Sequence, residues 1–296
     1  MSERRDAIPF VKMQGVGNDF VLLDGRELGE RDWPALAVAM CARRTGIGAD
    51  GLLVIAPSSQ ADLRMRMFNP DGSPDICGNG LRCVSRYAVE RGLVRQDSLR
   101  IETLVDVRSA QIHRHASAAV SSVTVDMGRP AFDPPRIPMN VSLDRVLDFP
   151  LKVESDLILT ITALSTGSTH AVTFVDALPD DGLFFSLSPK VEQHPLFPER
   201  TSLMWCRMER PSRSFSRIDM RIWERGAGET WGCGTGACAA AVAALAHGYA
   251  EAGEPVIVAS RGGELLIRWR EGEDIRMTGP AEFVFEGLYP LPEGKE

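Results

Sequence analysis

The sequence predicts a mixed α+β fold made of two similar halves, and three observations support this. The chain has 296 residues, about twice the length of a typical domain, and 44% of them are apolar, which is enough to bury a sizeable core. Most regular segments have the short or alternating apolar pattern of strands, with one prominent helical segment in each half. A motif of one cysteine and two glycines also occurs once in each half. This arrangement favours α+β over a series of βαβ units.

The first third of the chain is expected to contain strands and two helices. Residues 33–43 have apolar side chains at helical spacing, and a second helix is predicted over 81–91, ended by Gly92. The strands are short apolar runs bounded by turn residues, at residues 10–13, 20–24, 52–56 and 63–68.

The rest of the chain is expected to be mostly strands, with one alanine-rich helix over 237–247 that ends at Gly248. Residues 128–138 contain four prolines and are interpreted as the linker between an N-terminal domain, 1–127, and a C-terminal domain, 128–276. The strands are predicted at residues 99–103, 120–127, 157–163, 171–175, 216–223, 256–259, 265–269 and 283–285.

Composition excludes several classes of protein. A net charge of −7 and the lack of a long basic block argue against nucleic acid as the main partner. The longest apolar stretch, 237–245, is too short to span a membrane, and no signal-peptide core is recognisable, so we expect a cytoplasmic protein. The cysteines are expected to be thiols, and no metal site is expected because no Cys-x₂-Cys pair occurs. The six cysteines are residues 41, 77, 83, 206, 233 and 238.

The two halves repeat a motif in which a strand is followed by a turn, a cysteine and a helix. Cys-Gly-Asn-Gly at 77–80 in the first half corresponds to Cys-Gly-Thr-Gly at 233–236 in the second. Aligned on the cysteines, the equivalent pairs are Asn69 with Arg225, Gly72 with Gly228, Gly78 with Gly234 and Gly80 with Gly236.

A cysteine at the start of a helix has a clear chemical use. The helix N-terminus presents unpaired N–H groups and a partial positive charge, so it can hold a carboxylate. The same environment is expected to lower the pKa of the thiol from about 8.5 toward neutrality. Two such units facing one carbon would place a sulfur on each side of it. One thiolate could then remove a proton while the opposite thiol supplies another, which inverts the centre.

Several motifs, in order along nearly the whole chain, resemble the diaminopimelate epimerase family. The resemblance implies two pseudo-symmetric domains, each a curved, barrel-like mixed β-sheet around a central helix, with the active site in the interdomain cleft. It also implies that residues 277–296 return to the first domain and that no cofactor is used, neither pyridoxal phosphate nor metal. The segments that carry the resemblance are Met-Gln-Gly-Val-Gly-Asn-Asp-Phe (13–20), Gly-Ile-Gly-Ala-Asp-Gly-Leu (46–52), Phe-Asn-Pro-Asp-Gly-Ser (68–73), Cys-Gly-Asn-Gly-Leu-Arg-Cys (77–83), Trp-Glu-Arg-Gly-Ala-Gly-Glu-Thr (223–230), Cys-Gly-Thr-Gly-Ala-Cys-Ala-Ala-Ala (233–241) and Met-Thr-Gly-Pro-Ala-Glu-Phe-Val (277–284).

The resemblance assigns roles to individual positions. It implies that Cys77 and Cys233 are the acid/base pair, and that His170 and Glu224 tune the thiols. It implies that Arg225 faces a distal carboxylate of the substrate. Other implied substrate contacts, through side chain or backbone, are Asn18, Asn69, Gly78, Asn79, Gly234 and Thr235.

Two positions depart from the family pattern. The family's Gly-Asn-Pro-His turn is here Gly-Ser-Thr-His (167–170), and Ser202 replaces a second asparagine. Both asparagines normally bind the distal end of diaminopimelate, and serine offers fewer hydrogen-bonding groups and leaves space. Ser168 and Ser202 are therefore expected to alter specificity. The substrate is expected to be diaminopimelate, or alternatively another amino acid, such as a basic or imidazole-bearing one.

Other functions fit less well. Residues 234–239 match G-x-G-x-x-A, but the preceding strand ends about ten residues too early for a dinucleotide site. A cysteine hydrolase would leave the second motif unexplained. A non-catalytic binding protein of the same fold would be expected to lack one of the two cysteines. No lysine lies in a recognisable pyridoxal phosphate site. We therefore expect a small-molecule amino-acid substrate, no membrane partner and a possible homodimer.

Overall fold

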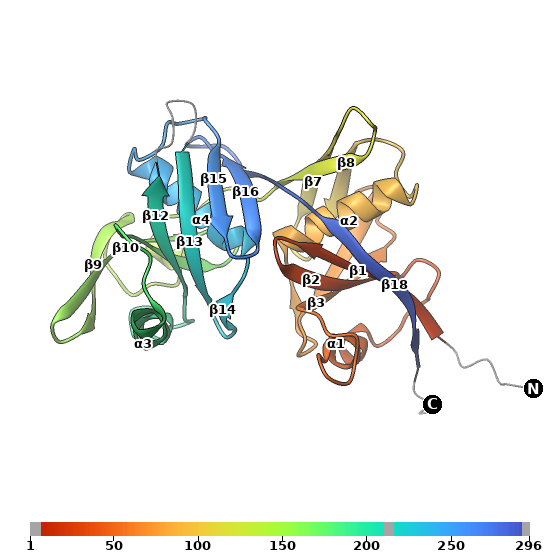
Figure 1. Cartoon of the computed structure of the whole chain (residues 1–296), viewed down its shortest axis with the longest axis horizontal. Coiled ribbons are helices and arrows are strands. Elements are labelled where there is room, and N and C mark those ends of the chain that lie inside the picture. Colours follow the sequence, from red (N-terminus) through yellow and green to blue (C-terminus); the bar gives the residue numbers. More distant parts are fainter. Residues whose placement is uncertain (1–6, 210–215, 292–296) are drawn as a thin grey trace, which may run out of the picture. The chain divides into compact units, whose positions relative to one another are not determined.

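The computed structural model describes residues 7–209 and 216–291, which divide into two compact units. Unit 1 consists of Met1–Val125 and Pro280–Glu296, and unit 2 of Asp126–Gly279. Figure 1 labels their elements. The sheet-dominated α+β fold predicted from the sequence is confirmed.

Unit 1 is built on one mixed sheet. Strands β2 and β3, and also β4 and β6, pair in parallel, and the other neighbours pair antiparallel. A short strand, β5 (Pro74–Asp75), adds to β4 just before the first cysteine motif. In the described residues the strand order is β18 (Glu282–Pro290), β1 (Ala7–Gly15), β2 (Asn18–Asp24), β3 (Gly51–Ala56), β4 (Leu63–Phe68), β6 (Ser98–Glu102), β7 (Val107–Arg114) and β8 (Val120–Asp126).

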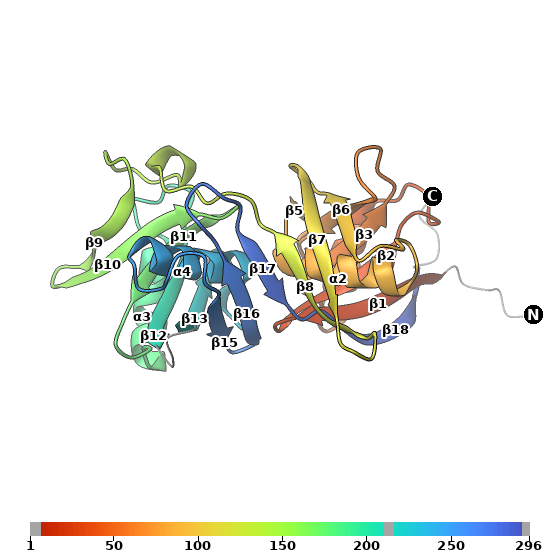
Figure 2. The ribbon, with the colours of Figure 1, turned by 90° about the horizontal axis from the view of Figure 1, so that it is seen from above.

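Two helices cover the faces of this sheet. Helix α2 (Gly78–Glu90) contacts β1, β2, β3, β4 and β7 (Figures 1 and 2). Helix α1 (Trp33–Cys41) contacts β2, β3 and β4 (Figure 1). Leu52 and Val54 pack in the core with α1, and Leu53, between them, points to α2 at Gly80. Because successive side chains of a strand point to opposite faces, β3 is buried along most of its length.

Unit 2 repeats this topology element by element. Strand β14 (Gly228–Thr230) adds to β13, as β5 adds to β4, and the parallel pairs are β11–β12 and β13–β15. In the described residues the order is β9 (Val146–Glu154), β10 (Leu157–Ser165), β11 (Thr169–Phe174), β12 (Ser202–Glu209), β13 (Ser216–Glu224), β15 (Val256–Ser260), β16 (Gly263–Arg268) and β17 (Arg276–Gly279).

The helices of unit 2 also correspond to those of unit 1. Helix α4 (Gly234–Ala246) contacts β10, β11, β12, β13, β15 and β16, and α3 (Asp181–Glu192) packs on β9, β12 and β13. Figure 2 shows α4 among the strands of its unit. Most of α4 is fully buried, which explains why it is apolar on all sides and rich in alanine. In residues 7–209 and 216–291 no helix is long and apolar enough to cross a membrane.

The structure corrects one prediction about a segment and contains several elements that were not predicted. The proline-rich residues 128–138 are part of unit 2 and do not form a free linker: Ala131 forms a β-bridge with Ser165, and Ile137 is fully buried next to the short 3₁₀ helix η1 (Pro134–Arg136). Helix α3 was not predicted. The strands that were also not predicted are β5, β7, β9, β12, β14 and β17.

Candidate active site

Each of the two motif cysteines is the N-cap residue of the buried helix in its unit. Cys77 and Cys233 have extended backbone angles, φ −138° and ψ 116° for the first and φ −125° and ψ 113° for the second. The sulfur of Cys77 accepts a hydrogen bond from Gly80 N–H at 3.4 Å, and that of Cys233 from Gly236 N–H at 3.3 Å. The first N–H groups of a helix have no partner within it, so each sulfur satisfies one of them. The repeated motif therefore produces the same local geometry twice.

The second glycine of each motif is required by packing. A Cβ atom on Gly80 would lie 2.8 Å from Leu53 Cδ2, and one on Gly236 would lie 2.6 Å from Met204 Sδ. Both distances are far below van der Waals contact, so a larger residue would displace the helix from the strand beneath it. These two glycines allow the cysteine-bearing turn to lie close against the sheet.

In unit 1, Cys77 lies beside an amide whose orientation is fixed. The Cys77 thiol donates to Asn18 Oδ1 at 3.6 Å, and Asn79 Nδ2 donates to the same oxygen at 3.2 Å. On its other side Asn18 Nδ2 donates to Asp50 Oδ2 at 2.7 Å. A carboxylate only accepts, so Asp50 holds the NH₂ group of Asn18 and leaves its carbonyl facing Cys77. This arrangement favours the protonated thiol.

Asp50 itself belongs to a compact cluster of charges. Arg43 Nη2 donates to Asp50 Oδ1 at 2.5 Å and also pairs with Asp19 at 3.2 Å. Lys12, which is 6% exposed, forms an ion pair with Asp19. Asp50 lies in the Gly-Ile-Gly-Ala-Asp-Gly-Leu segment (46–52), and no role was predicted for it. Its position behind Asn18 makes it the residue that orients a neighbour of Cys77.

In unit 2, Cys233 has a different set of neighbours. Its sulfur lies 3.4 Å from Thr235 Oγ1 and hydrogen-bonds with the carboxylate of Glu224, which also accepts from Thr230 Oγ1. Ser168 Oγ lies 3.4 Å from Thr235 Oγ1 and 3.5 Å from His170 Nε2. Two hydroxyl groups therefore connect His170 to Cys233.

His170 is fully buried, and burial lowers its pKa to about 4. It is therefore neutral at physiological pH, with one ring nitrogen a donor and the other an acceptor. Its Nδ1 lies 3.5 Å from Thr166 Oγ1, which donates to the Thr235 backbone carbonyl at 2.9 Å. His170 acts on the start of α4 through hydroxyl groups on both sides of its ring.

The expectation that the helix N-termini lower the pKa values of the two thiols is wrong. Burial raises the pKa of Cys77 to about 11, and burial together with the charge of Glu224 raises that of Cys233 well above its usual value. The N–H groups of the helices act in the opposite direction, but their effect is smaller. Removing a thiolate from water costs more than these N–H groups return, so both thiols are protonated at neutral pH.

Ser202 does not leave the empty space that was expected. It is 6% exposed, and its Oγ accepts a hydrogen bond from the backbone N–H of Arg225 at 3.1 Å. The exposed guanidinium of Arg225 donates to the Glu199 carbonyl at 3.1 Å. In unit 1 the residue equivalent to Arg225 is Asn69, which donates to Ser73 Oγ at 3.1 Å and thereby closes its turn. Ser202 therefore helps to set the backbone from which Arg225 projects.

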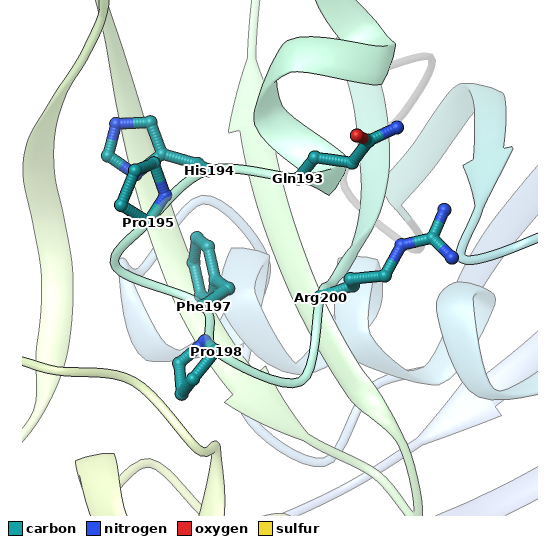
Figure 3. Close-up of a pocket in the computed structure, with 6 residues that line it drawn as sticks. All are labelled: Gln193, His194, Pro195, Phe197, Pro198 and Arg200. Carbon is teal, nitrogen blue, oxygen red and sulfur yellow. The ribbon is translucent and has the colours of Figure 1, made fainter.

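Unit 2 also has a surface pocket of about 510 Å³, shown in Figure 3. It contains neither motif cysteine. In the described parts of both units, no group of three or more His, Cys, Asp or Glu side chains is placed to hold a metal ion. The pocket is lined by Gln193, His194, Pro195, Phe197, Pro198 and Arg200.

Comparisons with known proteins agree with the repeat and the fold. The family model for diaminopimelate epimerase matches residues 10–132 and again residues 162–284. The diaminopimelate epimerase of Pelotomaculum thermopropionicum is 46% identical over 287 residues, covering 95% of this chain and 98% of that one. That of Moorella thermoacetica is 44% identical over 285 residues, covering 95% of this chain and 99% of that one.

Solved structures show the same fold at low sequence identity. A hydroxyproline epimerase from Agrobacterium vitis aligns with a TM-score of 0.70 at 17% identity, over 97% of this chain and 92% of that one. A PhzF-family phenazine biosynthesis protein from Bacillus anthracis aligns with a TM-score of 0.66 at 19% identity, over 97% of this chain and all of that one.

Proposed function

The chain belongs to the diaminopimelate epimerase family, and from this we propose that it interconverts LL- and meso-diaminopimelate with Cys77 and Cys233 as the acid and base. The chain is an isomerase that acts as an amino-acid epimerase. The proposed reaction needs neither pyridoxal phosphate nor a metal ion.

One observation carries the mechanism: the two equivalent helices both begin at a cysteine whose sulfur caps them. In the proposed reaction the N–H groups of these two helix starts, at Gly78-Asn79 and Gly234-Thr235, bind the α-carboxylate of the inverting centre. The thiolate of one cysteine takes the α-proton, and the thiol of the other donates its proton to the opposite face. The bond to one hydrogen breaks as another forms, and the two sulfurs exchange roles at each turnover.

The raised thiol pKa values fit such a reaction. An α-proton is weakly acidic, and a thiolate with a raised pKa is a stronger base toward it than an ordinary thiolate. Such a thiolate is scarce at neutral pH, so we propose that it forms after the substrate binds. Glu224, which hydrogen-bonds with Cys233, accepts the thiol proton, and the hydroxyl of Thr235 then donates to the sulfur. His170 holds that hydroxyl through Ser168.

The remaining predicted residues are proposed to read the substrate. Arg225 has an exposed guanidinium suited to a distal carboxylate, and Asn18 and Asn69 offer amide groups in the opposite unit. A different amino acid as substrate is the second candidate, and it rests on the serines at 168 and 202. We favour diaminopimelate, because the Ser202 hydroxyl accepts from the backbone N–H of Arg225. Ser202 thus supports the residue proposed to bind the distal carboxylate and does not leave the empty space that would favour a different substrate.

The test is an assay of the purified, reduced protein by chiral chromatography against diaminopimelate isomers and a panel of basic, imidazole-bearing and neutral amino acids. Diaminopimelate is expected to give the highest kcat/KM. Cys77→Ala and Cys233→Ala are each expected to abolish racemisation but to retain proton exchange with solvent at one face. Cys83→Ala, which alters a buried cysteine outside the site, is the matched control. Two-way racemisation by either single variant would exclude the two-base mechanism.

The serines are tested by replacing them with the family's asparagines. If they weaken recognition of diaminopimelate, Ser168→Asn combined with Ser202→Asn raises kcat/KM for it. Each regained hydrogen bond to a charged group would contribute about 1.5–3 kcal/mol, so the double variant would gain about a hundredfold or more. Unchanged kcat/KM in the double variant would show that the serines are harmless.

We also propose that the protein serves lysine biosynthesis, in the cytoplasm and as a homodimer. Family membership supports the pathway. Sedimentation of the purified protein and growth of a lysine auxotroph carrying the chain test these statements.

A further inference from the structure

A buried carboxylate holds the segment from which Glu224 and Arg225 project. Glu192, the last residue of α3, is 3% exposed. Its Oε2 accepts from the indole Nε1–H of Trp223 at 2.7 Å, and its Oε1 accepts from the backbone N–H of Gly226 at 2.7 Å. Trp223 and Gly226 stand on either side of the Glu224–Arg225 pair.

The cation that neutralises Glu192 comes from an unusual backbone position. Arg200 donates to Glu192 Oε1 and has a left-handed φ of 64°. This region disfavours residues other than glycine, asparagine and aspartate, so the position carries strain that an arginine does not relieve locally. Figure 3 shows its side chain extending away from Phe197 and Pro198.

The Glu224–Arg225 pair is held by these contacts at several points. Ser202 Oγ accepts from the Arg225 N–H, between the two groups that Glu192 binds. The Ala227 N–H closes a turn on the Glu224 carbonyl at 3.1 Å. A small rotation of the segment would move the Glu224 carboxylate relative to Cys233 and the Arg225 guanidinium together.

We propose that Glu192 is a positioning residue that fixes Glu224 against Cys233 and Arg225 against the distal carboxylate of the substrate. It touches neither the substrate nor the reacting atoms. The inference rests on the proposed function for its substrate readout, but its effect on Cys233 is independent of any substrate. It links the end of α3 to both the chemistry and the specificity of unit 2.

Glu192→Gln tests the proposal with little change in volume. An amide has one acceptor oxygen where the carboxylate has two, so either the Trp223 indole or the Gly226 N–H loses its acceptor. The kcat/KM for diaminopimelate is expected to fall roughly tenfold to a hundredfold, as for a buried donor left unpaired. Lysine, which is diaminopimelate without its distal carboxylate, is the matched probe. Its α-proton exchange should fall less, so discrimination between the two compounds shrinks.

The second readout needs no substrate. Glu224 raises the pKa of Cys233, so a displaced Glu224 lets Cys233 ionise at lower pH. In Glu192→Gln the alkylation of Cys233 by iodoacetamide should therefore begin at lower pH, with Cys77 unchanged as the internal reference. If the wild-type protein does not act on diaminopimelate, the proposed function fails while this readout still decides the present inference.

Two further variants complete the test. Glu154→Gln removes an exposed carboxylate at the end of β9 that pairs with Lys190 of α3, the helix that ends at Glu192. This variant should behave as wild type. Trp223→Phe removes the indole N–H that Glu192 accepts, together with one ring of the side chain, and should shift both readouts in the same direction as Glu192→Gln, by less. It also decides the question if Glu192→Gln does not fold. A folded Glu192→Gln or Trp223→Phe protein with unchanged discrimination and an unchanged alkylation profile of Cys233 overturns the proposal.

Discussion

Replacing Thr235 by valine should affect one of the two cysteines and leave the other unchanged. The hydroxyl of Thr235 lies 3.4 Å from the sulfur of Cys233, and valine has nearly the same shape without the hydroxyl. In unit 1 the equivalent residue is Asn79, whose NH₂ donates to Asn18 instead. The Thr235 hydrogen bond acts to lower the pKa of Cys233, so its loss should reduce the thiolate population there.

The magnitude follows from the geometry. A hydrogen bond to a charged group contributes about 1.5–3 kcal/mol, and the lower value is appropriate here because Ser168 also contacts the Thr235 hydroxyl. This corresponds to about tenfold less Cys233 thiolate at a given pH. A more basic thiolate is also more nucleophilic, with a Brønsted coefficient of about 0.4–0.5, so each remaining thiolate reacts about threefold faster. Alkylation of Cys233 in Thr235→Val should therefore slow by about threefold.

Iodoacetamide labelling followed by peptide mass spectrometry measures both cysteines in the same molecule. The expected result is slower labelling of Cys233 at unchanged labelling of Cys77. Thr173→Val is the matched control, because it removes a hydroxyl that bonds to the Thr160 carbonyl in the same unit. Equal slowing at both cysteines, or no change at Cys233, would refute the assignment of Thr235 as the hydroxyl that stabilises this thiolate.

Burial of Cys77 and His170 should make the stability of the protein depend on pH, and Asp50 should control the reactivity of Cys77. Burial raises the pKa of Cys77 from 9.0 to about 11. The free energy of unfolding should therefore be unaffected by this thiol below pH 9 and should fall by about 3 kcal/mol between pH 9 and 11, as the thiol ionises more easily in the unfolded chain. Denaturant titrations of Cys77→Ser should not show this fall. Burial lowers the pKa of His170 from 6.5 to about 4. The free energy of unfolding should therefore be unaffected by this imidazole above pH 6.5 and should fall by about 3 kcal/mol as the pH falls toward 4, because the unfolded chain takes up the proton first. The urea midpoint of His170→Gln should not show this decline. Asp50→Ala should free Asn18 to turn its NH₂ toward Cys77 and speed alkylation there, whereas Asp19→Ala, in the same charge cluster, should not.

The repeat could be predicted because its physical causes are local in sequence. A cysteine that caps a helix must directly precede it, and the glycine three residues later is required where the helix crosses a strand. Both requirements produce a short fixed spacing, so Cys-Gly-x-Gly is visible twice without knowledge of the fold. The alanine-rich stretch after Cys233 indicated a helix for the same reason, although its burial as α4 is known only from the structure.

Helix α3 was missed because its sequence contains conflicting signals. Asp180 caps it, and Phe184, Leu187 and Val191 recur at helical spacing. Gly182 and Pro189 lie within the helix and are poor helix formers, which hid the pattern. The three apolar side chains are at most 4% exposed in the core of unit 2, and this burial outweighs the low propensity. Strand β12 was missed because its first residues are buried in succession and show no alternation.

Residues that act through long-range contacts had no detectable signal. Asp50 reaches Asn18 across 32 positions of sequence, and Glu192 reaches Trp223 and Gly226 across 31 and 34. Neither carboxylate lies in a spacing that suggests chemistry. Each is recognisable only when the fold shows that a buried acceptor holds a group beside a cysteine or its partners. The pKa prediction failed for a related reason, because the motif reveals the helix N-terminus and not the depth at which the sulfur is buried.

The two units place their cysteines on the same scaffold but surround them with different chemistry. Cys77 faces a carbonyl that Asp50 holds in place, and a carbonyl can only accept, so this neighbour stabilises the thiol. Cys233 faces the hydroxyl of Thr235, which can donate to a thiolate, and the carboxylate of Glu224, which can take the thiol proton. Cys233 therefore has a hydroxyl donor and a carboxylate beside its sulfur, whereas the side chain beside Cys77 is a fixed hydrogen-bond acceptor. Because the two sulfurs have different neighbours, the two directions of epimerisation should under the proposed mechanism respond differently to substitution in the two units.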